Sequence, residues 1–192
     1  MTQPPNQTRT RCSWANGDPL MEAYHDAEWG VPVHDSRELW EMLVLESFQA
    51  GLSWRTILHR REGFRRAFEG FDPAVIAGYG PDKVEQLMQD EGIIRARAKI
   101  EATIGNARAY LRMKAEGRDF SEFVWSFVGG STVVNDGLVL PAQTEVSQAL
   151  SKALKAEGFK FVGPTIVYAF MQAVGMVDDH HPDCFRRADA SA

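Results

Sequence analysis

The sequence predicts a mostly α-helical protein, and three observations indicate this fold class. Residues that cap helices recur along the chain, with Pro at first turns and Gly after last turns. Apolar residues between these signals follow the spacing of amphipathic helices. Strand signals are scarce. With 192 residues, of which 44% are hydrophobic, the chain can bury a core as one domain or as two small lobes around a cleft.

The clearest predicted helix begins after Asp35. This residue is a typical N-cap, Glu38 stands three positions later as in a capping box, and Gly51 ends the apolar pattern. The same signals predict six more helices: from Pro73 to near Gly80, from Pro81 to near Gly92, over 97–115, 121–128 and 145–156, and from Pro164 to near Gly175. We expect the segment 129–143 to be a loop with a short extended piece at 138–140.

The composition and the two ends of the sequence predict the extent of the domain and the cellular compartment of the protein. We expect residues 1–10 and 188–192 to be disordered tails and residues 11–187 to form a single domain, most simply a monomer. Two cysteines and no apolar N-terminal segment predict a cytoplasmic protein without disulfides. The longest apolar stretch, 161–177, is interrupted by polar residues and falls short of the ~20 residues that span a bilayer, so no membrane association is expected.

Charge is distributed unevenly along the chain. The net charge of −5 does not favour a nucleic-acid partner. However, residues 55–66 contain five arginines and one glutamate, and residues 95–114 contain six basic residues and one glutamate. These runs could form a surface that faces phosphate groups, or they could be ordinary solvated helix faces.

Each end of the chain carries one cysteine with a nearby histidine. Cys12 and His25 are spaced as Cys-x12-His, and His180 and Cys184 as His-x3-Cys. Two sulfur and two imidazole donors suit a tetrahedral Zn²⁺, which they would saturate, so the metal would be structural and the chain ends would meet. Two buried free cysteines with hydrogen-bonded histidines explain the pattern equally well, and His181 could replace His180.

One acidic residue breaks the apolar pattern of its own helix. Glu46 follows Leu39 by seven positions and Leu43 by three, which places it on the face expected to be buried. A buried carboxylate is costly unless it is paired or used, although partial exposure near the helix end or a buried hydrogen-bond partner would also explain it. Aromatic residues that could stack on a flat cationic heterocycle, or equally belong to the core, are Trp14, Tyr24, Trp29 and Trp54.

A short link joins two of the predicted helices. Within EGIIRARAK, residues 91–99, Gly92 permits a tight turn. The N–H groups of this turn and the start of the following helix could hold a DNA phosphate. A turn of this kind is also common between packed helices that bind no ligand.

Five segments are distinctive when taken together: RCSWANGDPLMEAYHDAEWGVPVHDSRELWEMLVLESFQAGLSWRTIL, GIIRARAKI, NARAYL, FVWSFV and GFKFVGPTIVYAFMQAVGMVDDH. With them the chain resembles DNA-3-methyladenine glycosylase I, a family in the helix-hairpin-helix DNA glycosylase superfamily, from Cys12 to Cys184. The resemblance implies a base-excision repair enzyme that flips 3-methyladenine out of double-stranded, alkylated DNA. It also implies hydrolysis of the N-glycosidic bond without lyase activity.

The resemblance further implies roles for individual residues. One structural zinc would be bound by Cys12, His25, His180 and Cys184. Glu46 would be the catalytic residue that reads the exocyclic amine of the base, in a pocket shared with Trp14, Tyr24 and Trp54. Gly51 and Leu52 would fill the gap that the flipped base leaves. The hairpin would contact DNA through Gly92, Ile93, Arg95, Arg97 and Lys99.

The chain departs from the family pattern at two places. Met21 stands where the family has a tyrosine, and only Cys184 remains of a run of cysteines near the end. Many superfamily members carry an aspartate after the hairpin, but none occurs here between Gly92 and Arg118, and the resembled family lacks it too. Because methylation at N3 makes adenine cationic and a good leaving group, extrusion and selective binding of the base can supply most of the catalysis.

Three other functions fit parts of the sequence. A zinc hydrolase or deaminase could use Glu46 as general base, but it needs an open coordination position and usually shows an H-x-E and C-x-x-C signature. A zinc-stabilised DNA-binding or damage-sensing module could keep the hairpin without the chemistry. A glycosylase with lyase activity needs a well-placed amine, for which Lys99 is the nearest candidate to the hairpin.

Overall fold

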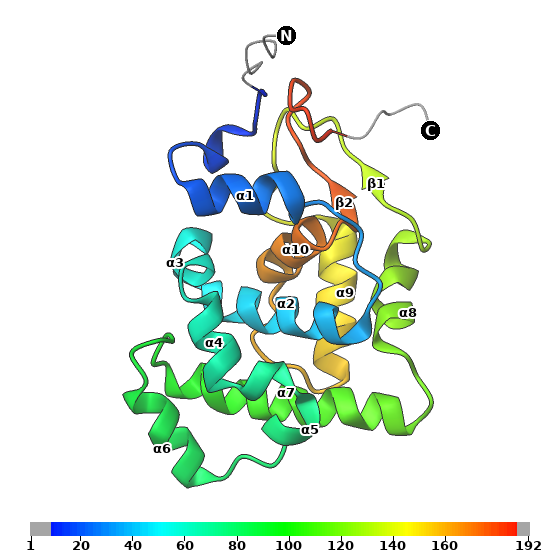
Figure 1. Cartoon of the computed structure of the whole chain (residues 1–192). Coiled ribbons are helices and arrows are strands. Elements are labelled where there is room, and N and C mark those ends of the chain that lie inside the picture. Colours follow the sequence, from blue (N-terminus) through cyan, green and yellow to red (C-terminus); the bar gives the residue numbers. More distant parts are fainter. Residues whose placement is uncertain (1–8, 188–192) are drawn as a thin grey trace, which may run out of the picture.

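The computed structural model describes residues 9–187 as a mostly α-helical protein (Figure 1). The α-helices in this range are α1 (Pro19–Ala27), α2 (Ser36–Gln49), α3 (Trp54–Leu58), α4 (Arg61–Ala67), α5 (Pro73–Ile76), α6 (Pro81–Gln89), α7 (Arg97–Ala115), α8 (Phe120–Trp125), α9 (Glu145–Ala156) and α10 (Pro164–Ala173). Short 3₁₀ helices lie at Ser13–Ala15, Glu69–Phe71 and Ser126–Val128. Two short strands are β1 (Val133–Val134) and β2 (Val177–Asp178). The predicted fold class is therefore confirmed as mostly helical.

Polar side chains begin several helices at the predicted places. Asp35 accepts hydrogen bonds from the N–H groups of Arg37 and Glu38 and so caps α2. Thr144 and Ser147 form a reciprocal capping box at α9. Helices α7 and α9 have the bounds that the sequence predicts, whereas α1, α3 and α4 were not predicted.

The prediction of an extended piece at 138–140 is wrong. The strand lies earlier, where β1 pairs in parallel with β2 and Val133 stands opposite Val177. At Gly137 the chain turns with a φ of +70° and passes so close to His180 that a Cβ atom would clash with the His180 carbonyl oxygen. This turn ends the pairing and leaves residues 138–140 exposed.

Two clusters of buried apolar side chains stabilise the fold. The larger one lies between α2, α7, α9 and α10, with α10 packed on both α2 and α9. The smaller one joins segments from both ends of the chain: Cys12, Met21, Tyr24, Trp29, Leu58, Ala173 and Cys184.

The two ends of the described chain meet near α1, at the opposite end of the molecule from α6 and α7 (Figure 1). The N–H of Phe185 donates to the carbonyl oxygen of Thr10 at 3.0 Å, and the guanidinium of Arg9 lies over the Phe185 ring. Residues 1–8 and 188–192, which fall in the predicted tails, lie outside the described residues. Within residues 9–187, none of the helices has the length and apolarity that a membrane span requires.

Candidate functional site

A cavity of about 180 Å³ lies between helices α2 and α10 and the N-terminal segments. Its lining residues are Trp14, Tyr24, Trp29, Glu46, Gln49, Trp54, Leu140, Ala169 and Gln172. The four residues that the sequence predicts for the base pocket are all among them. Met21, which stands where the resembled family has a tyrosine, belongs to the smaller buried cluster and not to this lining.

Glu46 is the acidic group of this cavity. It lies on the buried face of α2, with Leu39 and Leu43 fully buried on the same face, and its own side chain is 3% exposed. Its Oε2 atom has no hydrogen-bond partner among the described residues. Burial raises the pKa of this carboxyl to about 8. The Oε2 atom is therefore buried and unpaired among the described residues, and a cationic group entering the cavity would find an acceptor there.

Aromatic rings also line the cavity. The ring centroids of Tyr24 and Trp54 lie 5.3 Å apart, and those of Trp14 and Trp29 lie 5.0 Å apart. Burial, and to a lesser degree the charge of Glu46, raises the pKa of Tyr24 well above its usual value, so its hydroxyl stays protonated. The cavity thus offers stacking surfaces and one carboxyl, the combination that suits a flat cationic ring.

Several lining residues were not predicted. Gln172 appears in the sequence only as a polar interruption of an apolar helix, and that interruption was the signal that could have identified it. Leu140 comes from the exposed loop after β1, and Ala169 from α10 one turn before Gln172. Their positions depend on tertiary packing between α2 and α10, which local sequence patterns do not encode.

Three of the four predicted metal ligands converge near α1. One donor atom from each of Cys12, His25 and Cys184 lies within 4.8 Å of the others, and all three residues are buried. The Sγ of Cys184 is 3.3 Å from Nε2 of His25. Burial raises the pKa of the Cys12 thiol to about 11, so a thiolate at this place needs a neighbouring cation.

His180 lies beside this cluster, although outside the group of three. Its ring centroid is 5.2 Å from that of His25, and its Nε2 atom is buried without a partner in the described part of the chain. The Nδ1 atoms of His180 and His25 each contact a carboxylate, of Asp178 and of Asp26, at 2.9 Å. A carboxylate on Nδ1 is the usual arrangement of a histidine that binds metal through Nε2.

His181, the alternative ligand, points elsewhere. Its side chain is half exposed and lies 3.6 Å from the carboxylate of Asp183. Its main-chain N–H, in contrast, donates to Sγ of Cys12 at 3.3 Å. The geometry therefore favours His180 over His181 as the fourth donor.

Two tryptophans lie between the cavity and the cluster of cysteine and histidine side chains. The ring of Trp14 lies 5.4 Å from the ring of His25, and the ring of Trp29 lies 4.6 Å from the ring of His180. Both tryptophans line the cavity. Two walls of the cavity thus pack against the rings of His25 and His180.

The segment after α2 carries the predicted wedge. Gly51 has a φ of +81°, which glycine adopts without strain, and Leu52 is 42% exposed. The ammonium of Lys99 donates to the carbonyl oxygens of Phe48 and Ala50, at 2.8 and 2.7 Å. Lys99 therefore satisfies the carbonyl groups at the end of α2 and fixes the start of this segment, a contact that the sequence did not predict.

The link between α6 and α7 forms the predicted tight turn. The N–H of Gly92 donates to the carboxylate of Asp90 at 2.7 Å, and Ile93 is buried. Arg97 forms an ion pair with Glu85 at 2.8 Å, and Arg95 is half exposed. Helix α7 begins without a side-chain cap, which leaves its first N–H groups available to an anion.

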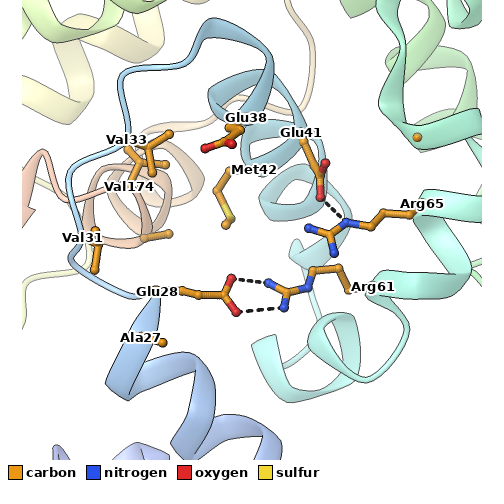
Figure 2. A pocket seen from close by; sticks show the side chains of 12 residues that line it. Ala27, Glu28, Val31, Val33, Glu38, Glu41, Met42, Arg61, Arg65 and Val174 are labelled. Carbon is orange, nitrogen blue, oxygen red and sulfur yellow. Dashed lines mark hydrogen bonds and ion pairs between the residues drawn. The ribbon is translucent and has the colours of Figure 1, made fainter.

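A larger cavity, of about 490 Å³, lies between the end of α1, α2 and α4 (Figure 2). Glu28 makes a bidentate ion pair with Arg61, and Glu41 accepts a hydrogen bond from Arg65 at 2.7 Å, as Figure 2 shows. Two arginines of the basic run 55–66 are thus paired internally. Because the predicted site residues all lie outside this lining, the smaller cavity is the candidate site.

The helical fold agrees with that of methyladenine glycosylases. A model of the methyladenine glycosylase family matches residues 14–187, and the chain therefore belongs to this family. Its relatives include DNA-3-methyladenine glycosylase 1 of Escherichia coli (strain K12), which is 55% identical over 177 residues, covering 91% of this chain and 95% of that protein.

Solved structures agree with this assignment. A crystal structure of 3-methyladenine DNA glycosylase I matches with a TM-score of 0.91 and 53% identity, covering 93% of this chain and 100% of that chain. A tyrosine-to-phenylalanine variant of a 3-methyladenine DNA glycosylase I, solved in complex with 3-methyladenine, matches with a TM-score of 0.86 and 36% identity, covering 93% of this chain and 98% of that chain.

Proposed function

We propose that this protein removes 3-methyladenine from alkylated double-stranded DNA by hydrolysing its N-glycosidic bond, as the first step of base-excision repair. The observation that carries the proposal is Glu46, a buried carboxyl without a described partner in a cavity lined by aromatic rings. The names of its relatives, and the 3-methyladenine bound to one of them, support the choice of base.

The chemistry follows from the charge of the substrate. Methylation at N3 makes the adenine of the nucleotide cationic, so the base is already a good leaving group. A cationic ring between Trp14, Tyr24 and Trp54 would lower the pKa of Glu46 from about 8 and favour its ionised form. Glu46 then attracts the base and accepts a hydrogen bond from its exocyclic amine. Selective binding of the extruded base supplies the rate enhancement.

DNA binding is proposed to use two elements, the segment after α2 and the link between α6 and α7. Gly51 and Leu52 enter the duplex and replace the flipped base, which offsets a flipping cost of a few kcal/mol. The turn at Gly92 and Ile93, the start of α7, and the side chains of Arg95 and Arg97 face the phosphates. Lys99 contributes indirectly, because its hydrogen bonds hold the end of α2 in place.

One structural zinc is proposed to join the chain ends. Cys12, His25, His180 and Cys184 supply two sulfur and two nitrogen donors, which fill a tetrahedral shell. The zinc would stabilise the thiolates of Cys12 and Cys184 and hold Trp14 and Trp29 against the cavity through the two histidines. With four protein ligands it has no position for a catalytic water.

We further propose that residues 11–187 act as a single glycosylase domain and a monomer on cytoplasmic DNA, without lyase activity. The amine nearest the hairpin, that of Lys99, already donates to two carbonyl oxygens. An amine held in this way is a poor nucleophile for a covalent intermediate.

The test is release of free bases from methylated DNA by the purified, zinc-loaded protein. We expect 3-methyladenine to be released and 7-methylguanine to be retained, with no strand cleavage at the resulting abasic sites. Absence of base release from the folded protein would overturn the proposal in favour of a DNA-binding module. Strand cleavage would overturn only the statement on lyase activity.

A further inference from the structure

Gln172 is a polar residue of the cavity that comes from a different helix than Glu46. It lies near the end of α10 and lines the cavity together with Glu46 of α2. Its Nε2 donates to Oδ2 of Asp179 at 2.8 Å. Asp179 is 2% exposed and also accepts hydrogen bonds from Asn135 Nδ2 and the Tyr168 hydroxyl, both at 2.6 Å. Three donors therefore converge on one buried carboxylate.

This network fixes the orientation of the Gln172 amide. Both side-chain oxygens of Asp179 already accept hydrogen bonds in this network. If the amide were turned over, its oxygen would face Oδ2 of Asp179 and two acceptors would repel each other in a buried place. The NH₂ group must therefore point to Asp179, which leaves the Oε1 atom as the polar group that Gln172 offers to the cavity.

We infer that Gln172 is a second specificity-determining residue, whose Oε1 accepts a hydrogen bond from the exocyclic amine of the bound base beside Glu46. This inference rests on the proposed function. The amine of adenine has two N–H donors, whereas guanine carries an oxygen acceptor at the same ring position. Two acceptors at this end of the pocket favour adenine derivatives and leave a guanine oxygen without a donor. Asp179 is a positioning residue that acts through Gln172.

The test compares two free bases on two variants. Binding of 3-methyladenine and of 3-methylpurine, which lacks the amine, is measured by the quenching of tryptophan fluorescence. Gln172→Met keeps the side-chain length but removes the acceptor. Tyr168→Phe is the matched control, because it removes another hydrogen bond to Asp179 and leaves the bond from Gln172 in place. Thermal unfolding of each variant reports whether it folds.

The expected result is selective. Gln172→Met should lower the affinity for 3-methyladenine on the order of fivefold to tenfold, with the affinity for 3-methylpurine unchanged. Tyr168→Phe should keep the preference of the parent protein for 3-methyladenine. Equal weakening of both bases would mean a purely structural role and would overturn the inference. So would an unchanged preference in Gln172→Met.

Failure of the inference is distinguishable from failure of the proposed function. If the parent protein binds 3-methyladenine and releases it from DNA but Gln172→Met keeps the preference, only the inference is wrong. If the parent protein neither binds 3-methyladenine nor releases it, the proposed function fails, and the inference fails with it.

Discussion

The two sides of the cavity are held in place by different means. The helical side, formed by residues of α2 and α10, belongs to the large core, where Leu39, Leu43 and Leu45 are fully buried. The terminal side, formed by Trp14, Tyr24 and Trp29, belongs to the small cluster that contains Cys12 and Cys184. Packing alone can therefore hold the helical side, whereas the terminal side depends on contacts between the two chain ends.

This difference indicates on which side of the cavity a buried carboxyl can be tolerated. Glu46 stays buried because α2 is held on several sides by apolar contacts. The terminal side has few such contacts and uses cysteine and histidine side chains to hold its aromatic rings. The two sides should accordingly respond to different perturbations, and the predictions below separate them.

The largest expected effect is on the pH dependence of stability. Burial raises the pKa of Glu46 from 4.5 to about 8, so the folded protein holds this proton more tightly than the unfolded chain. The stability from the protonated carboxyl is fully present below a pH of about 4.5 and is lost as pH rises through about 8, up to about 5 kcal/mol in total.

Urea unfolding of the parent protein and Glu46→Gln measures this loss. The variant lacks the titration, so its stability relative to the parent should increase between about pH 5 and about pH 9. All other titratable groups are common to both proteins and cancel in the difference. A stability difference that stays constant with pH would contradict the burial of an unpaired carboxyl at Glu46.

The second prediction concerns excision. Glu46→Gln should lower kcat/KM for 3-methyladenine release roughly 100- to 1,000-fold, because the amide carries no negative charge that attracts the cationic base. Glu41→Gln is the matched control on the same helix, since Glu41 lines the larger cavity and pairs with Arg65. In the parent protein, kcat/KM should rise with pH towards about 8, and this rise should be absent in Glu46→Gln.

Removal of the metal should act on the terminal side. A metal present at 100 times its Kd contributes about 2.7 kcal/mol, so chelation should lower Tm by roughly 5–10 °C. Tryptophan fluorescence should change because Trp14 and Trp29 contact the two histidines. Far-UV circular dichroism should keep most of its helical signal. Chelation without effect on Tm or fluorescence would remove the zinc from the proposal.

Two single variants sharpen the ligand assignment. His180→Ala should lose bound metal, measured by elemental analysis of the purified protein. His181→Ala should retain it, because the His181 ring is exposed and lies near Asp183. The reverse result would exchange the two histidines in the proposed site.

The smallest expected effect concerns Lys99. Lys99→Met leaves two carbonyl oxygens at the end of α2 without their donor and should cost about 1 kcal/mol of stability. Excision should fall a few-fold, because the segment with Leu52 is less well placed. The salt dependence of DNA binding should stay unchanged, whereas Arg97→Met should reduce its slope by about 1. A reduced slope for Lys99→Met would assign Lys99 a direct phosphate contact.

The sequence predicts the helical side of the cavity well and the terminal side less well. Helix α2 and the burial of Glu46 follow from local signals, namely the Asp35 cap and the apolar spacing. The cysteine and histidine spacing indicates that the chain ends meet, but it cannot choose between His180 and His181, because that choice depends on burial and on contacts with Asp178 and Asp183.

Contacts between distant segments account for what the sequence did not predict. The strand at Val133 forms because β2 lies beside it, and no local pattern encodes that pairing. Gln172 reaches the cavity only through the packing of α10 on α2. Lys99 was expected to face DNA, and its bonds to the end of α2 depend on how α7 packs.

The meeting of the chain ends has a consequence for synthesis. The terminal side of the cavity packs on the cluster that joins Cys12 to Cys184, at opposite ends of the described residues. A nascent chain can pack α2 against its early partners before Cys184 has been synthesised, but it cannot yet bring Cys184 to Cys12. The terminal side is therefore completed only after Cys184 has left the ribosome, so a translation product truncated before Cys184 lacks this side of the cavity even when its other helices have folded.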